Sequence, residues 1–188
     1  MVGDARATQR RLLEAAAQEF AARGIAGARV DRIAEAARSN KAQIYHYFGS
    51  KDQLFDAVFN ALVTGTLHEV PIDVTDLPEY AGRLFDRYEQ HPQVPQLATW
   101  YRLERAGTDA PLELVVKSNR DKVAAIAQAQ QSGDLPSHFA AADLLALILA
   151  LAALWTSATP EFAELTAAHT VAHRRRVVTD AVAAVLAR

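Results

Sequence analysis

Apolar residues recur along the chain three and four positions apart, and no segment alternates between apolar and polar residues as a β-strand does. The first such segment carries Leu13, Ala16, Ala17 and Phe20 on one face. We expect this first helix to end at Gly24, because glycine readily adopts the left-handed conformation that closes a helix. The pattern as a whole predicts an all-α fold.

Three further helices are predicted before residue 63. The second is short and turns Val30 and Ile33 inward, and the third covers roughly residues 41–48. Ser50 and Gln53 match a capping box, which predicts a fourth helix that starts at residue 51. Two short helices joined by a tight turn, braced by a longer first helix, let the later helix enter the major groove of DNA.

The periodic pattern lapses between Gly65 and Pro78, a stretch with two prolines and no clear helical face. We interpret it as the junction between a DNA-binding head, residues 1–63, and a body, residues 64–188. Beyond it the pattern predicts five more helices, near residues 77–90, 94–106, 111–131, 140–157 and 160–187.

Composition limits the class of protein. The 188 residues include no cysteine, which excludes disulfides and thiolate metal sites. The longest apolar run, Leu144 to Trp155, is shorter than the roughly 20 residues that span a bilayer, and the first residues lack a secretory signal. Residues 1–60 carry nine Lys and Arg against seven Asp and Glu, although the whole chain has a net charge of −2. We expect a soluble, cytoplasmic protein with a mildly basic head.

The third helix has two dissimilar faces. Ile44 and Phe48 are four residues apart and so point toward the same core. Ala42, Gln43 and His46 then point most nearly away from that core. These outward side chains are the ones expected to meet base edges in the groove.

Phosphate contacts are expected around this helix. Tyr45 and Tyr47 lie on its flanks, where a phenol packs its ring on protein and offers its hydroxyl to a phosphate. Asn40 is a favourable N-cap, so the helix N-terminus and the neighbouring Lys41 present positive charge. Lys51 adds a second charge. The complete set of expected DNA-contacting residues is Arg29, Ser39, Asn40, Lys41, Ala42, Gln43, Tyr45, His46, Tyr47 and Lys51.

The segment from Gly24 to Val58, "GIAGARVDRIAEAARSNKAQIYHYFGSKDQLFDAV", resembles the DNA-binding signature of the TetR (tetracycline-repressor) family of bacterial regulators. With the first helix, the resemblance covers about fifty residues. The matching positions are Gly24, Val30, Ile33, Ala34, the "IYHYF" run, Ser50, Lys51 and Leu54. The resemblance implies a homodimeric, ligand-responsive repressor that binds a palindromic operator and is released by a small-molecule effector.

The sequence departs from the family pattern at three places. Arg38 and Ser39 stand where the family usually has Gly-Val, so the turn must form without glycine. Ala28 and Arg29 replace the usual Thr or Ser cap of the second helix; Arg29 offers charge to a phosphate but cannot cap. Gln43 replaces a small residue, and two interpretations stay open: it reads a base edge, or it folds back on Asn40 as half of a capping box.

The resemblance also implies that the last two helices form the dimer interface. The run from Leu144 to Trp155 is apolar nearly all round, as expected for a helix buried by its own subunit and by a partner. The last helix is expected to begin with Thr159 as its cap and Pro160 in its first turn. A monomer core is the alternative use of these surfaces. The expected interface residues are Leu144, Leu151, Val171, Val178, Val182 and Val185.

An effector pocket is expected in the body. In the helix near residues 111–131, Asn119 is the one polar member of an apolar stripe, and a buried amide needs a partner. Aromatic residues from other helices would wall a largely apolar cavity, although an ordinary aromatic core fits the same residues. The expected pocket residues are Tyr88, Trp100, Tyr101, Asn119 and Trp155.

Motifs for catalysis are absent from the sequence. His169 and His173 are four residues apart, but no glutamate lies between them as a zinc protease requires. We therefore expect no enzyme activity, cofactor or metal. Two alternatives remain: a regulator or activator without a small-molecule ligand, and a helical ligand-binding or enzymatic domain that does not bind DNA.

Overall fold

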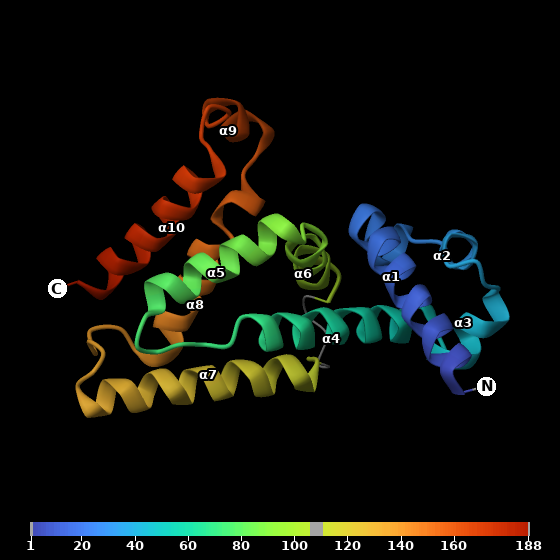
Figure 1. The fold of residues 1–188 in the computed structure, drawn as a ribbon, viewed down its shortest axis with the longest axis horizontal. Coiled ribbons are helices and arrows are strands. Elements are labelled where there is room, and N and C mark those ends of the chain that lie inside the picture. Colours follow the sequence, from blue (N-terminus) through green and yellow to red (C-terminus); the bar gives the residue numbers. More distant parts are fainter. Residues whose placement is uncertain (1, 106–110, 188) are drawn as a thin grey trace. The chain divides into compact units, whose positions relative to one another are not determined.

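The computed structural model describes residues 2–105 and 111–187, and every regular element in these ranges is helical, which confirms the all-α prediction (Figure 1). In chain order the helices are α1 (Val2–Gly27), α2 (Val30–Ala36), α3 (Lys41–Phe48), α4 (Lys51–Glu69), α5 (Leu77–Gln90), α6 (Gln93–Glu104), α7 (Glu113–Ser132), α8 (Ala141–Ala152), the 3-10 helix η1 (Leu154–Ser157), α9 (Pro160–Leu165) and α10 (Val171–Leu186).

The helices form two compact units that interleave along the sequence. The first comprises Met1–Gly65 and Gln93–Leu112, and the second comprises Thr66–Pro92 and Glu113–Arg188. The expected boundary between residues 63 and 64 divides a DNA-binding head from a body, and this division by function stays a prediction. By packing, α6 belongs with the helices that precede residue 65.

The first unit has a small core built from the inward faces of its helices. Phe20 of α1 meets Phe55 of α4 edge to face, with ring centroids 5.3 Å apart. Ile33 of α2 and Ile44 of α3 are fully buried. Leu97 of α6 is also fully buried, and α6 packs against α1. These contacts hold the short α2 and α3 against the longer helices.

Helical geometry breaks at Gly24, as the sequence predicts, and resumes for one more turn as far as Gly27. Gly24 has a φ of 70°, a conformation that residues with a Cβ atom rarely adopt. The Glu104 carboxylate of α6 accepts hydrogen bonds from the Ile25 and Ala26 N–H groups, at 2.8 and 2.9 Å. The Trp100 indole N–H donates to the Ala21 carbonyl at 3.0 Å. α6 therefore stabilises the break in α1.

The second unit packs α5, α7, α8 and α10 around an apolar core. Arg175 of α10 joins the surfaces of α5 and α10, because its guanidinium donates to Glu79 at 2.7 Å and to Asp86 at 2.8 Å. These two hydrogen bonds raise the pKa of Arg175 above its ordinary value. The largest fully buried side chains of this core include Leu77, Tyr80, Phe85, Ile126 and Leu144.

The prediction of one final helix over residues 160–187 is wrong, since the chain forms two helices there. α9 ends at Leu165, and α10 starts at Val171 after Thr170, whose hydroxyl accepts from the His173 N–H at 3.1 Å. The predicted start is confirmed: Thr159 caps α9 and Pro160 occupies its first turn. Among the described residues, no helix combines the length and apolar character needed to cross a bilayer.

Candidate nucleic-acid interface

The start of α3 is fixed by Asn40, as predicted. Its side-chain oxygen accepts a hydrogen bond from the Gln43 N–H at 2.9 Å, which satisfies one of the free donors of the first turn. The next N–H groups and the Lys41 side chain lie at the same exposed end. A helix N-terminus of this kind attracts anions such as phosphate.

The predicted faces of α3 are confirmed. Ile44 is fully buried and Phe48 is 9% exposed, so both anchor the helix on the core. Ala42, Gln43 and His46 are exposed and form the opposite face. An exposed face one helix wide, carrying an amide and an imidazole, is suited to hydrogen bonding with base edges in a major groove.

The two tyrosines on the flanks are not equivalent. Tyr45 is 49% exposed. Tyr47 is half-buried, and its ring lies edge to face with His46 at 5.3 Å and against Phe48 at 6.2 Å. Tyr45 is therefore the freer of the two to move toward a phosphate.

Gln43 does not complete a capping box. Its side-chain oxygen accepts a hydrogen bond from the Ser39 hydroxyl, while the Asn40 side chain caps the Gln43 N–H. The interpretation that Gln43 folds back on Asn40 is therefore wrong. The Gln43 side chain stays exposed, and base reading by it remains a prediction.

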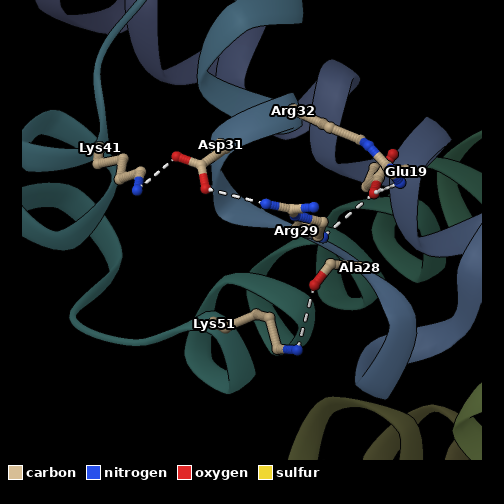
Figure 2. A network of polar contacts seen from close by, with 7 residues as sticks. All are labelled: Glu19, Ala28, Arg29, Asp31, Arg32, Lys41 and Lys51. Atoms are coloured by element: carbon tan, nitrogen blue, oxygen red, sulfur yellow. Dashed lines mark hydrogen bonds and ion pairs between the residues drawn. The ribbon is translucent and has the colours of Figure 1, made fainter.

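Asp31, in the first turn of α2, holds two of the expected phosphate-contacting cations (Figure 2). One carboxylate oxygen pairs with the Lys41 ammonium, and the other lies 3.9 Å from the Arg29 guanidinium. All three side chains are half or more exposed to solvent. The acid therefore sits between two groups that the sequence assigns to DNA phosphates, and no sequence motif had singled it out.

Glu19 compensates for the missing cap of α2. Arg29 occupies the N-cap position without a side-chain cap, as expected. The Glu19 carboxylate of α1 accepts from the Arg29 backbone N–H at 3.1 Å and pairs with the Arg32 guanidinium at 3.4 Å (Figure 2). In a capping box a glutamate three residues later bonds this same N–H, so Glu19 supplies that bond from another helix.

Lys51 bonds to the protein backbone within the first unit. Its ammonium donates to the carbonyls of Ala26 and Ala28, both at 3.2 Å, and the side chain is half-buried. Figure 2 shows the contact with Ala28. Those carbonyls belong to the end of α1 and the link to α2. Lys51 therefore fixes this link with two of its three N–H groups, and a DNA contact through the third stays a prediction.

The turn between α2 and α3 forms without glycine. Arg38 adopts a φ of 51°, and the Ser39 N–H donates to the Ala34 carbonyl at 2.9 Å to close the turn. For a residue with a Cβ atom this left-handed conformation costs about 1–2 kcal/mol. Arg38, which stands where the family usually has glycine, is thus a strained position in the helix-turn-helix.

Comparison with known proteins identifies the chain. A family model described as "Bacterial regulatory proteins, tetR family" matches residues 12–58. A second, described as "Tetracyclin repressor-like, C-terminal domain", matches residues 76–184, which is more than half of the chain. The chain belongs to the TetR family.

Individual proteins of the TetR family are similar over most of the chain. The HTH-type transcriptional repressor SCO4008 of Streptomyces coelicolor is 38% identical over 159 residues, 84% of this chain and 82% of that protein. The structure described as the transcriptional regulator SCO4942 of Streptomyces coelicolor is also 38% identical, with a TM-score of 0.86, and covers 96% of this chain and 99% of its own. AibR, crystallised with isovaleryl coenzyme A and operator DNA, shares the fold, with a TM-score of 0.70 and 19% identity over 95% and 98% of the two chains.

These findings establish the class of protein. The chain is a TetR-family transcriptional repressor with a DNA-binding helix-turn-helix, and such proteins are regulators rather than enzymes. Among the residues that the structure describes, no cluster of three or more His, Cys, Asp or Glu side chains is arranged to hold a metal ion.

The aromatic residues expected to line the TetR-family effector pocket are engaged in packing. The Trp100 indole N–H donates a hydrogen bond to the Ala21 carbonyl, and the Tyr101 ring stacks on Phe59 with ring centroids 4.7 Å apart. Burial raises the pKa of Tyr88, and the Trp155 indole N–H donates to the Arg174 carbonyl at 3.2 Å. A role for these four residues in effector binding stays a prediction.

The expectation that Asn119 is a buried amide is wrong, because its side chain is exposed to solvent. The buried face of α7 runs one residue earlier, through Ser118, Ile126 and Ala129. Lys122 lies on this face, donates to the Ser118 hydroxyl at 3.0 Å, and has a pKa lowered by burial. Ser118 and Lys122 are thus the inward polar groups of α7, which the apolar pattern did not identify.

The stripe expected at the dimer interface lies in the core of a single chain. Val178 and Val182 are fully buried and Leu144 is 1% exposed, in the core shared by α5, α8 and α10. Leu151 and Val185 are half-buried, and only Val171, 49% exposed, lies largely on the surface. The expectation that Leu144, Val178 and Val182 contact a partner chain is therefore wrong, because a single chain already buries them. The exposed residues of α8 are the alanine line Ala142, Ala146 and Ala150 and the neighbouring Asp143.

Proposed function

We propose that this repressor acts in the cytoplasm as a homodimer that binds a palindromic operator and is released by a small-molecule effector. The observation that carries the DNA-binding mode is the exposed face of α3, Ala42, Gln43 and His46, beside Lys41 and an N-terminus capped by Asn40. One such helix offers few base contacts, and tight specific binding then requires two copies.

Different residues would carry affinity and specificity. Gln43 and His46 are suited to base edges, while Ala42 allows close approach of the helix to a base or a thymine methyl group. Lys41, Arg29, the Tyr45 and Tyr47 hydroxyls and the N-terminus of α3 are suited to phosphates. Lys41 and Arg29 must exchange Asp31 for phosphate when they bind. Affinity should therefore fall steeply with salt, while preference among sequences should depend on Gln43 and His46.

The exposed alanine line of α8 supports the proposed dimer. Ala142, Ala146 and Ala150 recur every four residues and therefore share one face, opposite the buried Leu145 and Ile148. Small residues allow two helices to approach closely across a two-fold axis. Such packing of α8 and α10 from two chains would form a four-helix bundle, with α8 rather than the valine stripe of α10 at its centre.

Effector release would act through the body. The support is the family, together with AibR, a protein of the same fold that was crystallised with isovaleryl coenzyme A and operator DNA. Ser118 and Lys122 provide inward polar groups beside apolar residues of α7, a composition typical of ligand sites. An effector that binds the non-operator conformation more tightly shifts the population away from DNA, whereas equal binding to both conformations changes nothing.

Selection of binding sites from random duplex DNA tests this function. The purified protein should enrich an inverted repeat whose half-sites are about 34–36 Å apart, or a multiple of that spacing. Sedimentation of the complex should give an even number of chains per repeat. Enrichment of a single half-site by one chain would contradict the dimeric mode, and absence of any enriched sequence would contradict specific operator binding.

A further inference from the structure

A groove in the first unit lies between α1 and the turn that follows α2. It has a volume of about 320 Å³, and Arg11 of α1 and Arg38 of the turn line it together with small residues at the end of α2. Asn40, the N-cap of α3, follows Arg38 by two positions in the chain. The groove therefore adjoins the N-terminus of the helix that faces the major groove.

The two arginines of this groove have no acidic partner. The Arg11 guanidinium donates to the Thr8 hydroxyl at 3.1 Å, and among the described residues no carboxylate pairs with Arg11 or Arg38. Glu14 also lines the groove, but its carboxylate lies 3.7 Å from the guanidinium of Arg10. Both groove arginines are exposed, so two guanidinium groups are available to an anion from solution.

The cations at the start of α2 and α3 differ in this respect. Lys41 and Arg29 share the Asp31 carboxylate, which a phosphate must displace before it can bind them (Figure 2). An anion that meets the groove arginines displaces no carboxylate. The groove therefore offers the less costly contact for a phosphate.

Stability does not explain an arginine at this turn. Arg38 has a φ of 51°, and glycine would adopt this left-handed conformation without strain. Residues held in such strained conformations cluster at ligand-binding sites, where the strained side chain has a function. A contact between the Arg38 guanidinium and a ligand accounts for both the strain and the free charge.

From these observations we propose that Arg11 and Arg38 together bind a backbone phosphate of the operator duplex, beside the base pairs that α3 reads. The guanidinium group presents its N–H donors in a planar fork that matches the oxygens of a phosphate. A free phosphate ion has the same chemistry, but the position of the groove next to the N-terminus of α3 favours the duplex. The inference rests on the proposed operator binding through α3 and adds a contact outside its exposed face.

A salt series with the duplex that the unchanged protein selects measures the contribution of the groove. Arg38→Ala keeps the Cβ atom, and with it the strain, but removes the charge. It should weaken binding about threefold to tenfold at low salt and reduce the salt slope by about one unit per half-site. Arg11→Ala should act in the same way, whereas Arg38→Lys keeps the charge and should retain the slope.

The control is Arg102→Ala, which removes an exposed arginine of α6 in the same unit and should change neither affinity nor slope. Circular dichroism checks that each variant is folded. Equal losses in Arg38→Ala and Arg102→Ala would show that only the overall charge matters, and would overturn the groove as a phosphate site.

Replacing single phosphates of the same duplex by neutral methylphosphonates locates the contact. At one phosphate in each half-site, the replacement should weaken binding of the unchanged protein and leave binding of Arg38→Ala unaffected, because the variant has no charge to lose there. Losses that add at every phosphate would overturn this contact and leave operator binding through α3 standing. If the unchanged protein selects no duplex, operator binding and this contact both fail.

Inorganic phosphate titrated into the protein without DNA distinguishes a soluble anion from the duplex. Saturable phosphate binding that Arg38→Ala abolishes, with no change in the affinity of that variant for the duplex, would assign the groove to a soluble anion and overturn the proposal.

Discussion

At the scale of single residues, Asp31 pairs with Lys41 and Arg29, two cations that we propose contact DNA phosphates. Asp31→Asn removes the charge that holds Lys41 and Arg29 and that would repel nearby phosphates. Because exposed ion pairs are worth about 0.2–1 kcal/mol, we expect operator affinity to rise a few-fold in low salt. The gain should shrink in high salt, which screens exposed charges. Fluorescence anisotropy over a salt series measures both effects.

The control for Asp31 is Glu35→Gln, which removes another exposed carboxylate from the same helix. If the two substitutions raise affinity equally, only the overall charge matters, and Asp31 has no special relation to Lys41 and Arg29.

Lys51 is predicted to act on stability. Lys51→Met keeps the length of the side chain but removes the donors to the Ala26 and Ala28 carbonyls, which should lower the free energy of unfolding by about 1–2 kcal/mol. Lys117→Met, at an exposed lysine paired with Asp121 in the same helix, should cost less than about 0.5 kcal/mol. Urea denaturation compares the two. Unchanged stability of Lys51→Met, with only a flatter salt dependence of DNA binding, would assign Lys51 to phosphate alone.

The sequence predicts residues whose roles depend on local spacing. Ile44 and Phe48 are correctly placed in the core because side chains four apart share a face, and Asn40 is correctly placed as a cap. It does not predict the partners of Lys51, which are backbone carbonyls 23 and 25 residues away. Side-chain type does not reveal such contacts, since they arise only when the helices pack.

At the scale of elements, the strained turn between α2 and α3 offers a stabilising substitution. Arg38→Gly should relieve the cost of a φ of 51°. Glycine also makes the unfolded chain more flexible, which offsets part of this gain, so the free energy of unfolding should rise by up to about 1 kcal/mol. Arg38→Ala removes the same charge but keeps the Cβ atom, so it should not stabilise the protein. Thermal and urea unfolding of the three proteins test this; equal stability of the glycine and alanine variants would show that the turn is not strained.

Element boundaries were predictable where the sequence carries a local signal. Gly24 marked the break in α1, and Thr159 with Pro160 marked the start of α9. The break between α9 and α10 contains neither glycine nor proline, and its one local signal, the N-cap Thr170, did not interrupt the helical pattern. On α7 the predicted buried face was wrong by one residue, which corresponds to a rotation of 100° about the helix axis. The apolar pattern of this helix fits Asn119 nearly as well as Ser118, so it did not distinguish the two faces.

At the scale of the whole molecule, the proposed dimer depends on the exposed face of α8. Ala146→Arg places a long cation on that face without touching the buried core, so the chain should fold, sediment as a monomer and bind operator at least tenfold more weakly. Val178→Asp instead buries an unpaired carboxylate inside one chain, and it should prevent stable folding of the second unit. Sedimentation and circular dichroism distinguish these outcomes. A folded Ala146→Arg dimer with unchanged operator affinity would place the interface elsewhere.

The most direct test of the account is the base preference of the Gln43→Ala variant, compared with that of the unaltered protein in selection from random duplex DNA. The exposed Gln43 side chain on α3 is predicted to read one base pair in each half-site. Its loss should relax preference at two positions related by the symmetry of the inverted repeat, at a cost of about 1–3 kcal/mol for a bidentate contact. Preference elsewhere in the repeat should stay unchanged. An identical enriched sequence for both proteins would contradict the assignment of Gln43 on α3 as a base-reading residue.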